Sequence, residues 1–344
     1  MQRLIFIVDD NDANLAMAAM ALEAEYRVLT IPSAEKMFSL LEKKKPDIIL
    51  LDIEMPEQSG FDAMKKLKSC DAYSKIPVIF LTSRTDTASE AHGIELGAVD
   101  FIQKPFSEPV LLNRIKHHLN IDKLIRERTE HLVRLQNGIV FIMADMVENR
   151  DISTGGHIER TATYAKILIE AMLSQGVYAD EMRGWNLELV VSSMRLHDLG
   201  KVVIPDSILN KPGPLTKEEF QVMKTHSVEG ERIIDKAIRR TGDAEFLNNA
   251  KAIAVSHHER WDGTGYPYEL KGTEIPLLGR IMAIIDVYDA LVSERPYKKA
   301  FSHQEAVEII MEGSGKHFDP LIADVFNRIN EQILKASELD CPGK

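Results

Sequence analysis

The sequence predicts a multidomain chain: a doubly wound α/β domain over about residues 1–120, then a helical domain over residues 149–344. Three patterns carry this prediction. Short apolar runs alternate with helical patterns in the first part, and a heptad of apolar residues follows. The remainder has helical spacing with histidines and aspartates along it. A connector helix over residues 121–148 is expected between the two domains.

The composition is that of an ordinary globular protein. The 344 residues are 44% apolar and 28% charged, with a net charge of −11. An acidic chain of this kind is not expected to bind nucleic-acid polymers or an anionic membrane, because both need basic surface. The two cysteines, Cys70 and Cys341, are far apart, and no apolar run is as long as a membrane span. We therefore expect a cytoplasmic protein without a disulfide framework.

Four short apolar runs predict the strands of a parallel sheet. They lie at residues 4–8, 47–51, 77–81 and 99–102, with helical patterns such as 14–24 and 34–43 between them. Runs that are apolar throughout suit strands buried on both faces. The functional crevice of a doubly wound sheet lies at the carboxyl ends of its strands. There the sequence places Asp9, Asp10, Asp52, Thr82 and Lys104.

Three carboxylates meeting at one edge would repel one another unless a cation lay among them, and oxygen ligands of this kind suit Mg²⁺. A nearby lysine and hydroxyl suit a transferred phosphoryl group, whose oxygens need positive charge and hydrogen-bond donors. With these positions in order, the first 120 residues closely resemble a response-regulator receiver, which is flavodoxin-like.

That resemblance implies a role for each matching residue. Asp52 would accept a phosphoryl group from a sensor histidine kinase. The Mg²⁺ site would comprise Asp9, Asp10, Asp52 and the Glu54 carbonyl, and the switch residues would be Thr82, Phe101 and Lys104. The alternative is a domain that keeps the receiver fold and is never phosphorylated.

The connector carries a heptad seam. Steps of four and three residues link Ile121, Ile125, Arg128, Leu132, Leu135, Ile139, Ile142 and Met146, and all but Arg128 are apolar. The seam lasts more than three heptads, so we expect the helix to pair with a second copy in a homodimer. The alternative is an amphipathic helix packed within one chain.

The second domain reads as helical, with spacing over residues 161–172, 187–196, 216–236, 246–256 and 281–293. Capping boxes are expected at Thr216 with Glu219 and at Ser302 with Glu305. Histidine is the commonest metal ligand among side chains. Five histidines that could bind a metal lie along these helices: His157, His197, His226, His257 and His258.

Two carboxylates accompany these histidines. Asp198 follows His197, and Asp286 lies in an apolar helix, where a buried carboxylate is costly unless it is paired or bound to metal. Seven ligands exceed the need of one ion, and a carboxylate can bridge two. Two metal ions can stabilise the attacking and leaving oxygens of a phosphoryl displacement. Lys201, three residues after Asp198, could neutralise phosphate charge.

Several motifs of this domain together resemble the HD-GYP branch of the HD-domain metal phosphohydrolases. They are His197 to Lys201, Ile204 to Asp206, Lys211 to Gly213, His257 to Pro267 and Arg295 to Lys298. The resemblance implies hydrolysis of cyclic di-GMP to pGpG and, in some members, on to GMP. It also implies metal binding by His157, His197, Asp198, His226, His257, His258 and Asp286, with Asp198 and Lys201 catalytic. Substrate contacts would come from Lys201, Tyr266, Arg295 and Lys298.

One position departs from the family pattern. Members with three metals carry a glutamate four residues before the first ligand histidine, where this chain has Ser153. We therefore expect two transition-metal ions, for which Fe, Mn, Ni and Zn all suit the histidine and carboxylate ligands. The alternatives are a non-catalytic cyclic di-GMP sensor or docking module, and a phosphohydrolase that acts mainly on pGpG or another nucleotide.

Overall fold

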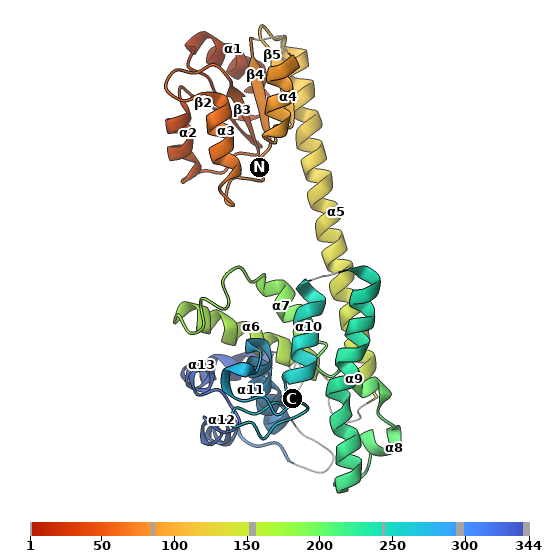
Figure 1. Ribbon diagram of the computed structural model, residues 1–344. Helices are drawn as coiled ribbons and strands as arrows, with labels where there is room; N and C mark the ends of the chain where they lie inside the picture. Colours follow the sequence, from red (N-terminus) through yellow and green to blue (C-terminus); the bar gives the residue numbers. More distant parts are fainter. Residues whose placement is uncertain (1, 84–86, 151–155, 243–244, 294–298, 340–344) are drawn as a thin grey trace. The chain divides into compact units, whose positions relative to one another are not determined.

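The computed structural model describes residues 2–83, 87–150, 156–242, 245–293 and 299–339. The chain divides into two compact units, Met1–Leu132 and Val133–Lys344. The first is an α/β unit and the second is helical, as the sequence predicts (Figure 1).

The first unit is a five-stranded parallel sheet in the order β2-β1-β3-β4-β5. Its strands are β1 (Leu4–Val8), β2 (Arg27–Ile31), β3 (Ile48–Asp52), β4 (Val78–Thr82) and β5 (Asp100–Gln103). The helices are α1 (Asp12–Leu22), α2 (Ala34–Leu41), α3 (Gly60–Lys68), α4 (Thr87–Glu95) and the start of α5 (Glu108–Glu148).

Helices cover both faces of this sheet because successive strand residues point to opposite sides. In β1, Phe6 and Val8 join a core with α2 and α3, whereas Ile5 and Ile7 join a core with α1 and α5. All four side chains are fully buried. The continuous apolar runs that predicted the strands are thus explained by burial on two faces.

The strand at residues 27–31 was not among the four that the sequence predicted. It lies at the edge of the sheet, where Arg27 and Thr30 are exposed and only Ile31 is buried. An edge strand lacks the unbroken apolar run of a central strand, which is why its sequence gave no comparable signal.

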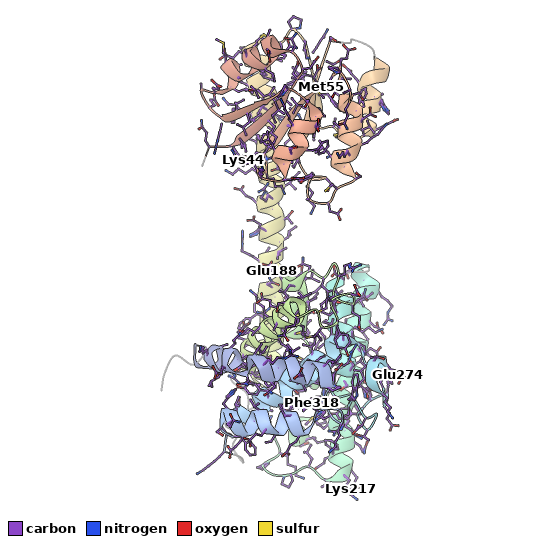
Figure 2. All side chains as sticks on the ribbon, turned by 90° about the vertical axis from the view of Figure 1, so that its left-hand side faces the viewer. Lys44, Met55, Glu188, Lys217, Glu274 and Phe318 are labelled. Atoms are coloured by element: carbon purple, nitrogen blue, oxygen red, sulfur yellow. The ribbon has the colours of Figure 1, made fainter. Side chains whose placement is uncertain are left out.

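The second unit consists of the end of α5 and further helices. They are α6 (His157–Ser174), α7 (Leu187–Met194), η1 (Leu199–Val203), α8 (Asp206–Leu209), α9 (Lys217–Thr241), α10 (Glu245–Ser256), η2 (Gly272–Glu274), α11 (Leu277–Val292), α12 (His303–Glu312) and α13 (Pro320–Leu339). Both predicted capping boxes are confirmed, at the starts of α9 and α12. Phe318 lies buried in the main core, whereas Glu188 and Lys217 are exposed (Figure 2).

The C-terminal turns of α5 pack into this second unit. Val140, Ala144 and Val147 are buried. Val140 and Val147 belong to a cluster with residues of α9 and α10, such as Ile234 and Ala254. None of the helices in the described part of the chain is long and apolar enough to cross a membrane.

Candidate metal centre

Helix ends and helix faces bring the seven expected ligands toward one place. His157 is the first residue of α6, His226 lies in α9 and Asp286 lies in α11. His197 and Asp198 occupy the turn between α7 and η1, and His257 and His258 directly follow α10. Side chains that are up to 129 residues apart in sequence therefore share one site.

The first ligand group contains His157, His197 and Asp198. The two imidazole Nε2 atoms are 3.2 Å apart, and His197 Nε2 lies 3.4 Å from Asp198 Oδ2. Asp286 adjoins this group, with its Oδ1 3.6 Å from His157 Nε2. Both histidines are buried.

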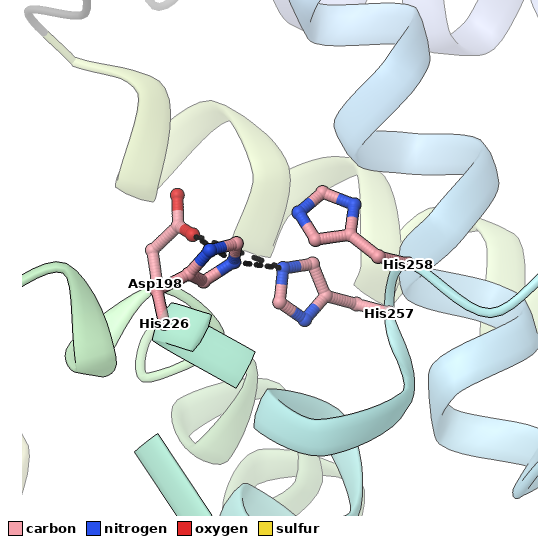
Figure 3. A group of neighbouring side chains, drawn as sticks. All are labelled: Asp198, His226, His257 and His258. Carbon is pink, nitrogen blue, oxygen red and sulfur yellow. Dashed lines mark hydrogen bonds and ion pairs between the residues drawn. The ribbon is translucent and has the colours of Figure 1, made fainter. Parts of the chain in front are cut away.

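The second group contains Asp198, His226, His257 and His258 (Figure 3). His226 Nε2 lies 3.5 Å from His257 Nε2 and 3.5 Å from Asp198 Oδ1. His257 Nε2 lies 3.7 Å from the same oxygen. The two adjacent histidines that follow α10 thus belong to the same group.

Asp198 joins the two groups because each of its carboxylate oxygens faces a different one. Oδ2 faces His197, and Oδ1 faces His226 and His257. Oδ1 is buried and has no hydrogen-bond partner among the described residues. A buried carboxylate oxygen without a partner is costly unless a cation or proton satisfies it.

The histidines are held so that their Nε2 atoms point into the site. Nδ1 of His197 lies 3.0 Å from the Met194 carbonyl, and Nδ1 of His226 lies 2.7 Å from the Met223 carbonyl. Nδ1 of His257 lies 3.1 Å from the Ile253 and Ala254 carbonyls. Because a carbonyl only accepts, Nδ1 must carry the proton, which leaves a lone pair on Nε2 in the neutral ring.

These lone pairs face one another, which is unfavourable unless a positive charge lies between them. Metal–nitrogen and metal–oxygen bonds of about 2.1 Å place neighbouring ligand atoms about 3.0–3.4 Å apart in octahedral or tetrahedral geometry. The six separations given above, 3.2–3.7 Å, are close to that range. The residues therefore fit divalent metal ions.

Asp289 and Arg160 orient His157 and were not expected from the sequence as site residues. Asp289 is buried, and its Oδ2 lies 2.7 Å from His157 Nδ1. Arg160 donates to both Asp289 oxygens, at 2.7 and 2.9 Å. Burial would raise the pKa of Asp289, but hydrogen bonds from His157 and Arg160 bring it below its usual value. One sequence feature could have indicated Asp289 as a site residue: it lies three positions after Asp286 in a mostly apolar helix, so both carboxylates are on one helix face.

Gly200 lets η1 approach α9 closely enough to assemble the second group. A Cβ atom at this position would lie 1.8 Å from the His226 carbonyl oxygen and 2.6 Å from the Gly230 amide nitrogen. Lys201 follows on η1, where three residues make one turn and bring positions 198 and 201 to one face. Lys201 Nζ lies 2.7 Å from Asp198 Oδ2.

Tyr266, an expected substrate contact, lies beside the second group. Its ring centroid is 4.8 Å from that of His258 and 6.5 Å from that of His226. Phe220 and Lys224 of α9 flank it, with Lys224 Nζ 5.6 Å from the Tyr266 ring and Phe220 46% exposed. Glu259 accepts backbone hydrogen bonds from residues 268 and 270 and so holds this loop. The other expected substrate contacts, Arg295 and Lys298, lie outside the described residues, as does Ser153.

The first unit brings its own expected site together at the carboxyl ends of the strands. Asp9, Asp10 and Asp52 form a group that could hold a cation. Lys104 Nζ lies 2.7 Å from both Asp9 Oδ2 and Asp52 Oδ1.

The other expected residues of the receiver site lie nearby in the same unit. Thr82 is buried, and the centroid of the Phe101 ring lies 5.5 Å from that of Phe80. Burial raises the pKa of Asp52 despite the hydrogen bond from Lys104. Glu54 accepts a hydrogen bond from Ser83 through its side chain, and a role for its carbonyl stays a prediction.

Comparison with known proteins assigns both units. The response regulator receiver domain matches residues 5–116, and the HD domain matches residues 142–322. A Vibrio cholerae protein named probable cyclic di-GMP phosphodiesterase is 41% identical, over 94% of this chain and 77% of its own. The cyclic di-GMP phosphodiesterase response regulator RpfG of Xanthomonas campestris is 31% identical, over 96% and 88%. A Vibrio cholerae 3'3'-cGAMP-specific phosphodiesterase 2 is 39% identical, over 54% and 33%.

The second unit contains an HD domain, and the two candidate ligand groups described above lie within it. The chain belongs to the family of response regulators that join a receiver domain to an HD domain.

Burial of the neutral histidines has a consequence for stability at acid pH. Burial lowers the pKa of His226 to about 4, so between pH 6.5 and about 4 the unfolded chain binds a proton that the folded chain does not. The free energy of unfolding of metal-free protein should therefore fall as pH is lowered through this window. The His226→Gln variant should show a shallower fall. Some of the fall should remain in this variant, because burial also lowers the pKa of His317 to about 4.

Urea unfolding in the presence of a chelator would measure this effect. Both tryptophans, Trp185 and Trp261, lie in the second unit, so their fluorescence reports on the HD domain. An equal slope of stability against pH for the wild type and His226→Gln would contradict the assignment of a neutral, buried His226.

Proposed function

We propose that this protein is a metal-dependent phosphodiesterase that hydrolyses cyclic di-GMP to pGpG under control of phosphorylation at Asp52. The observation that carries the proposal is the Asp198 carboxylate, which turns one oxygen to each of two ligand groups. The named activities of the relatives from Vibrio cholerae and Xanthomonas campestris support the substrate. The metal ligands would be His157, His197, Asp198, His226, His257, His258 and Asp286.

Two bound cations would supply Lewis-acid stabilisation of the attacking and leaving oxygens. Imidazole and carboxylate ligands suit Fe, Mn, Ni or Zn. Side chains of the protein would perform the remaining steps. Asp198 and the carbonyl-held histidines would hold the cations that bind the scissile phosphate, and Lys201, beside Asp198 on η1, would face that phosphate. An ammonium group there neutralises developing phosphate charge and can donate a proton to the departing 3′ oxygen.

Replacing His197 and Asp198 together by alanine should lower cyclic di-GMP turnover by at least about 100-fold, because ligands of both groups are lost. The measurement is pGpG release by metal-loaded, full-length protein, resolved by chromatography. His92→Ala in the receiver unit, which lies in neither ligand group, is the control and should keep wild-type turnover. Unchanged turnover in the double variant would refute the site.

The same assay separates the alternatives. A non-catalytic cyclic di-GMP sensor would bind the dinucleotide without releasing pGpG. The relative named as 3'3'-cGAMP-specific makes that dinucleotide a second candidate substrate, so cyclic di-GMP, 3'3'-cGAMP and pGpG belong in one panel. We expect the highest kcat/KM for cyclic di-GMP, since relatives named for it align over most of this chain.

The receiver site supports control by phosphotransfer from a sensor histidine kinase. Asp52 lies at the end of β3 beside Asp9 and Asp10, which would bind Mg²⁺ together with it. Lys104 and Thr82 lie where they would contact a phosphoryl group on Asp52, and Phe101 would respond as the switch residue. The sequence features also favour a cytoplasmic protein, where such a kinase would meet it.

Asp52→Asn should abolish phosphoryl uptake from a small-molecule donor such as acetyl phosphate, because the acceptor carboxylate is gone. Intact-protein mass spectrometry in the presence of Mg²⁺ measures the added phosphoryl group. Asp62→Asn, a change at an exposed carboxylate in the first turn of α3, should leave uptake intact. Equal labelling of Asp52→Asn and wild type would show that Asp52 is not the acceptor.

The face of α5 supports a homodimer. The apolar residues of the heptad seam, from Ile121 to Met146, are 39–66% exposed within one chain. In a coiled coil, the same face of a second α5 would cover these seven exposed apolar side chains, which lie in heptad register. Arg128 is the polar position of this seam and would limit the registers that the pair can adopt.

Ile139→Asp should dissociate that dimer, since it places a charge among the apolar residues of the seam. Light scattering coupled to size-exclusion chromatography gives the mass at stepped concentrations. Val133→Asp is the matched control, because Val133 is 42% exposed on the same helix but lies off the seam. A wild-type protein that stays monomeric at high micromolar concentration would rule the dimer out.

A further inference from the structure

The last turn of α5 contacts the metal centre on two sides. Glu148 is the final residue of this helix, and Arg150 follows it by two. Neither residue belongs to the expected ligand set. Glu148 accepts hydrogen bonds from the backbone of His157 and Ile158, and Arg150 donates to the backbone of η1, the segment that begins directly after Asp198.

Glu148 caps the helix that begins with His157. Gly156 precedes α6 at a φ of 80° and makes no side-chain cap bond. The Glu148 carboxylate takes that role, accepting from the His157 amide at 2.9 Å and from the Ile158 amide at 3.4 Å. A carboxylate at a helix N-terminus satisfies unpaired amides and is favoured by the helix dipole. The position of His157 is therefore tied to the end of α5.

Arg150 holds the segment that follows Asp198. Its guanidinium donates to the carbonyls of Val202 at 2.6 Å and Ile204 at 3.1 Å, with a longer bond to Lys201 at 3.3 Å. It also donates to Asp206 Oδ1 at 2.7 Å. Several donors in a fixed planar fork fix η1 in direction as well as distance. The segment that carries Lys201 is therefore tied to the same end of α5.

The stretch of α5 that precedes Glu148 and Arg150 is itself packed into the HD unit. Val140, Ala144 and Val147 are buried in the HD unit, and Ser192 of α7 donates to Asn137 at 2.7 Å. Ala144, Val147 and Glu148 also line a cavity of about 20 Å³ whose other walls include His157, His197 and Asp198. The end of the helix is thus one wall of the first ligand group.

We propose that Glu148 and Arg150 are positioning residues through which the end of α5 sets where His157 stands relative to Asp198 and Lys201. This inference rests on the proposed function for its kinetic part. A small rotation or shift of α5 would pull on both sides of the first ligand group at once. Misplacement by about 1 Å can cost about 100-fold in rate, so such a movement would suffice to change turnover.

Cation affinity tests the inference without reference to activity. Glu148→Ala removes the cap, whereas Glu148→Gln keeps one acceptor oxygen. We expect Glu148→Ala to weaken binding of the first-group cation by about 10- to 100-fold, with Glu148→Gln in between. Competition between the metal-free protein and a chelating dye for Mn²⁺ or Zn²⁺ measures this. Glu127→Gln, an exposed site on the same helix, is the control and should bind as wild type.

Kinetics then separate positioning from simple destabilisation. Saturated with metal, Glu148→Ala and Arg150→Gln should lose kcat for cyclic di-GMP by about 10- to 100-fold with KM changed by less than about 3-fold. Arg150→Lys keeps the charge but not the fork, so it should recover little. Wild-type affinity and wild-type kcat in Glu148→Ala would overturn the inference, even if its melting temperature fell.

The two proposals can fail separately. If the wild type bound metal but did not cleave cyclic di-GMP, the proposed function would fall, and the affinity series would still decide the role of Glu148. If Glu148→Ala did not fold, Glu148→Gln would decide. Unchanged cation affinity and kcat in that variant would overturn the inference, and a graded loss would support it.

Discussion

Repulsion between lone pairs that face one another is the constraint on which the HD unit depends. Helix carbonyls of α7, α9 and α10 fix the protons of His197, His226 and His257 on Nδ1, so their Nε2 atoms converge without a proton to share. The ionised Asp198 lies among them. Burial would raise its pKa, but the Lys201 ammonium holds that pKa well below the usual value. Such an arrangement is stable only around positive charge, so folding and cation binding are expected to be coupled.

The sequence was most informative where chemistry requires rare residues at fixed spacing. Five histidines and an aspartate in an apolar helix predicted a metal site before any fold was known, and the structure brings these side chains close together. Unbroken apolar runs likewise located the central strands. In each case the physical requirement, a ligand or burial on two faces, leaves a pattern within one short stretch of chain.

Other features depend on contacts between distant segments, and no local pattern shows them. Glu148 looks like an ordinary glutamate near the end of an amphipathic helix. Its role arises because Gly156 offers no side chain to cap α6, whose first residue, His157, lies nine positions after Glu148. Arg150 finds its partners more than fifty residues later. The edge strand β2 was missed for a different reason: its exposed residues interrupt the apolar run that marks a buried strand.

The burial of Val140, Ala144 and Val147 in the HD unit affects how the protein can be divided or recombined. A fragment starting at residue 149 would lack the helical segment that fills one side of its core, along with the Glu148 cap. Fusions that replace the receiver with another sensory module should therefore join upstream of residue 133, where the second compact unit begins. They should also keep the phase of α5, because one inserted residue would turn the helix by about 100° beneath whatever is attached to it.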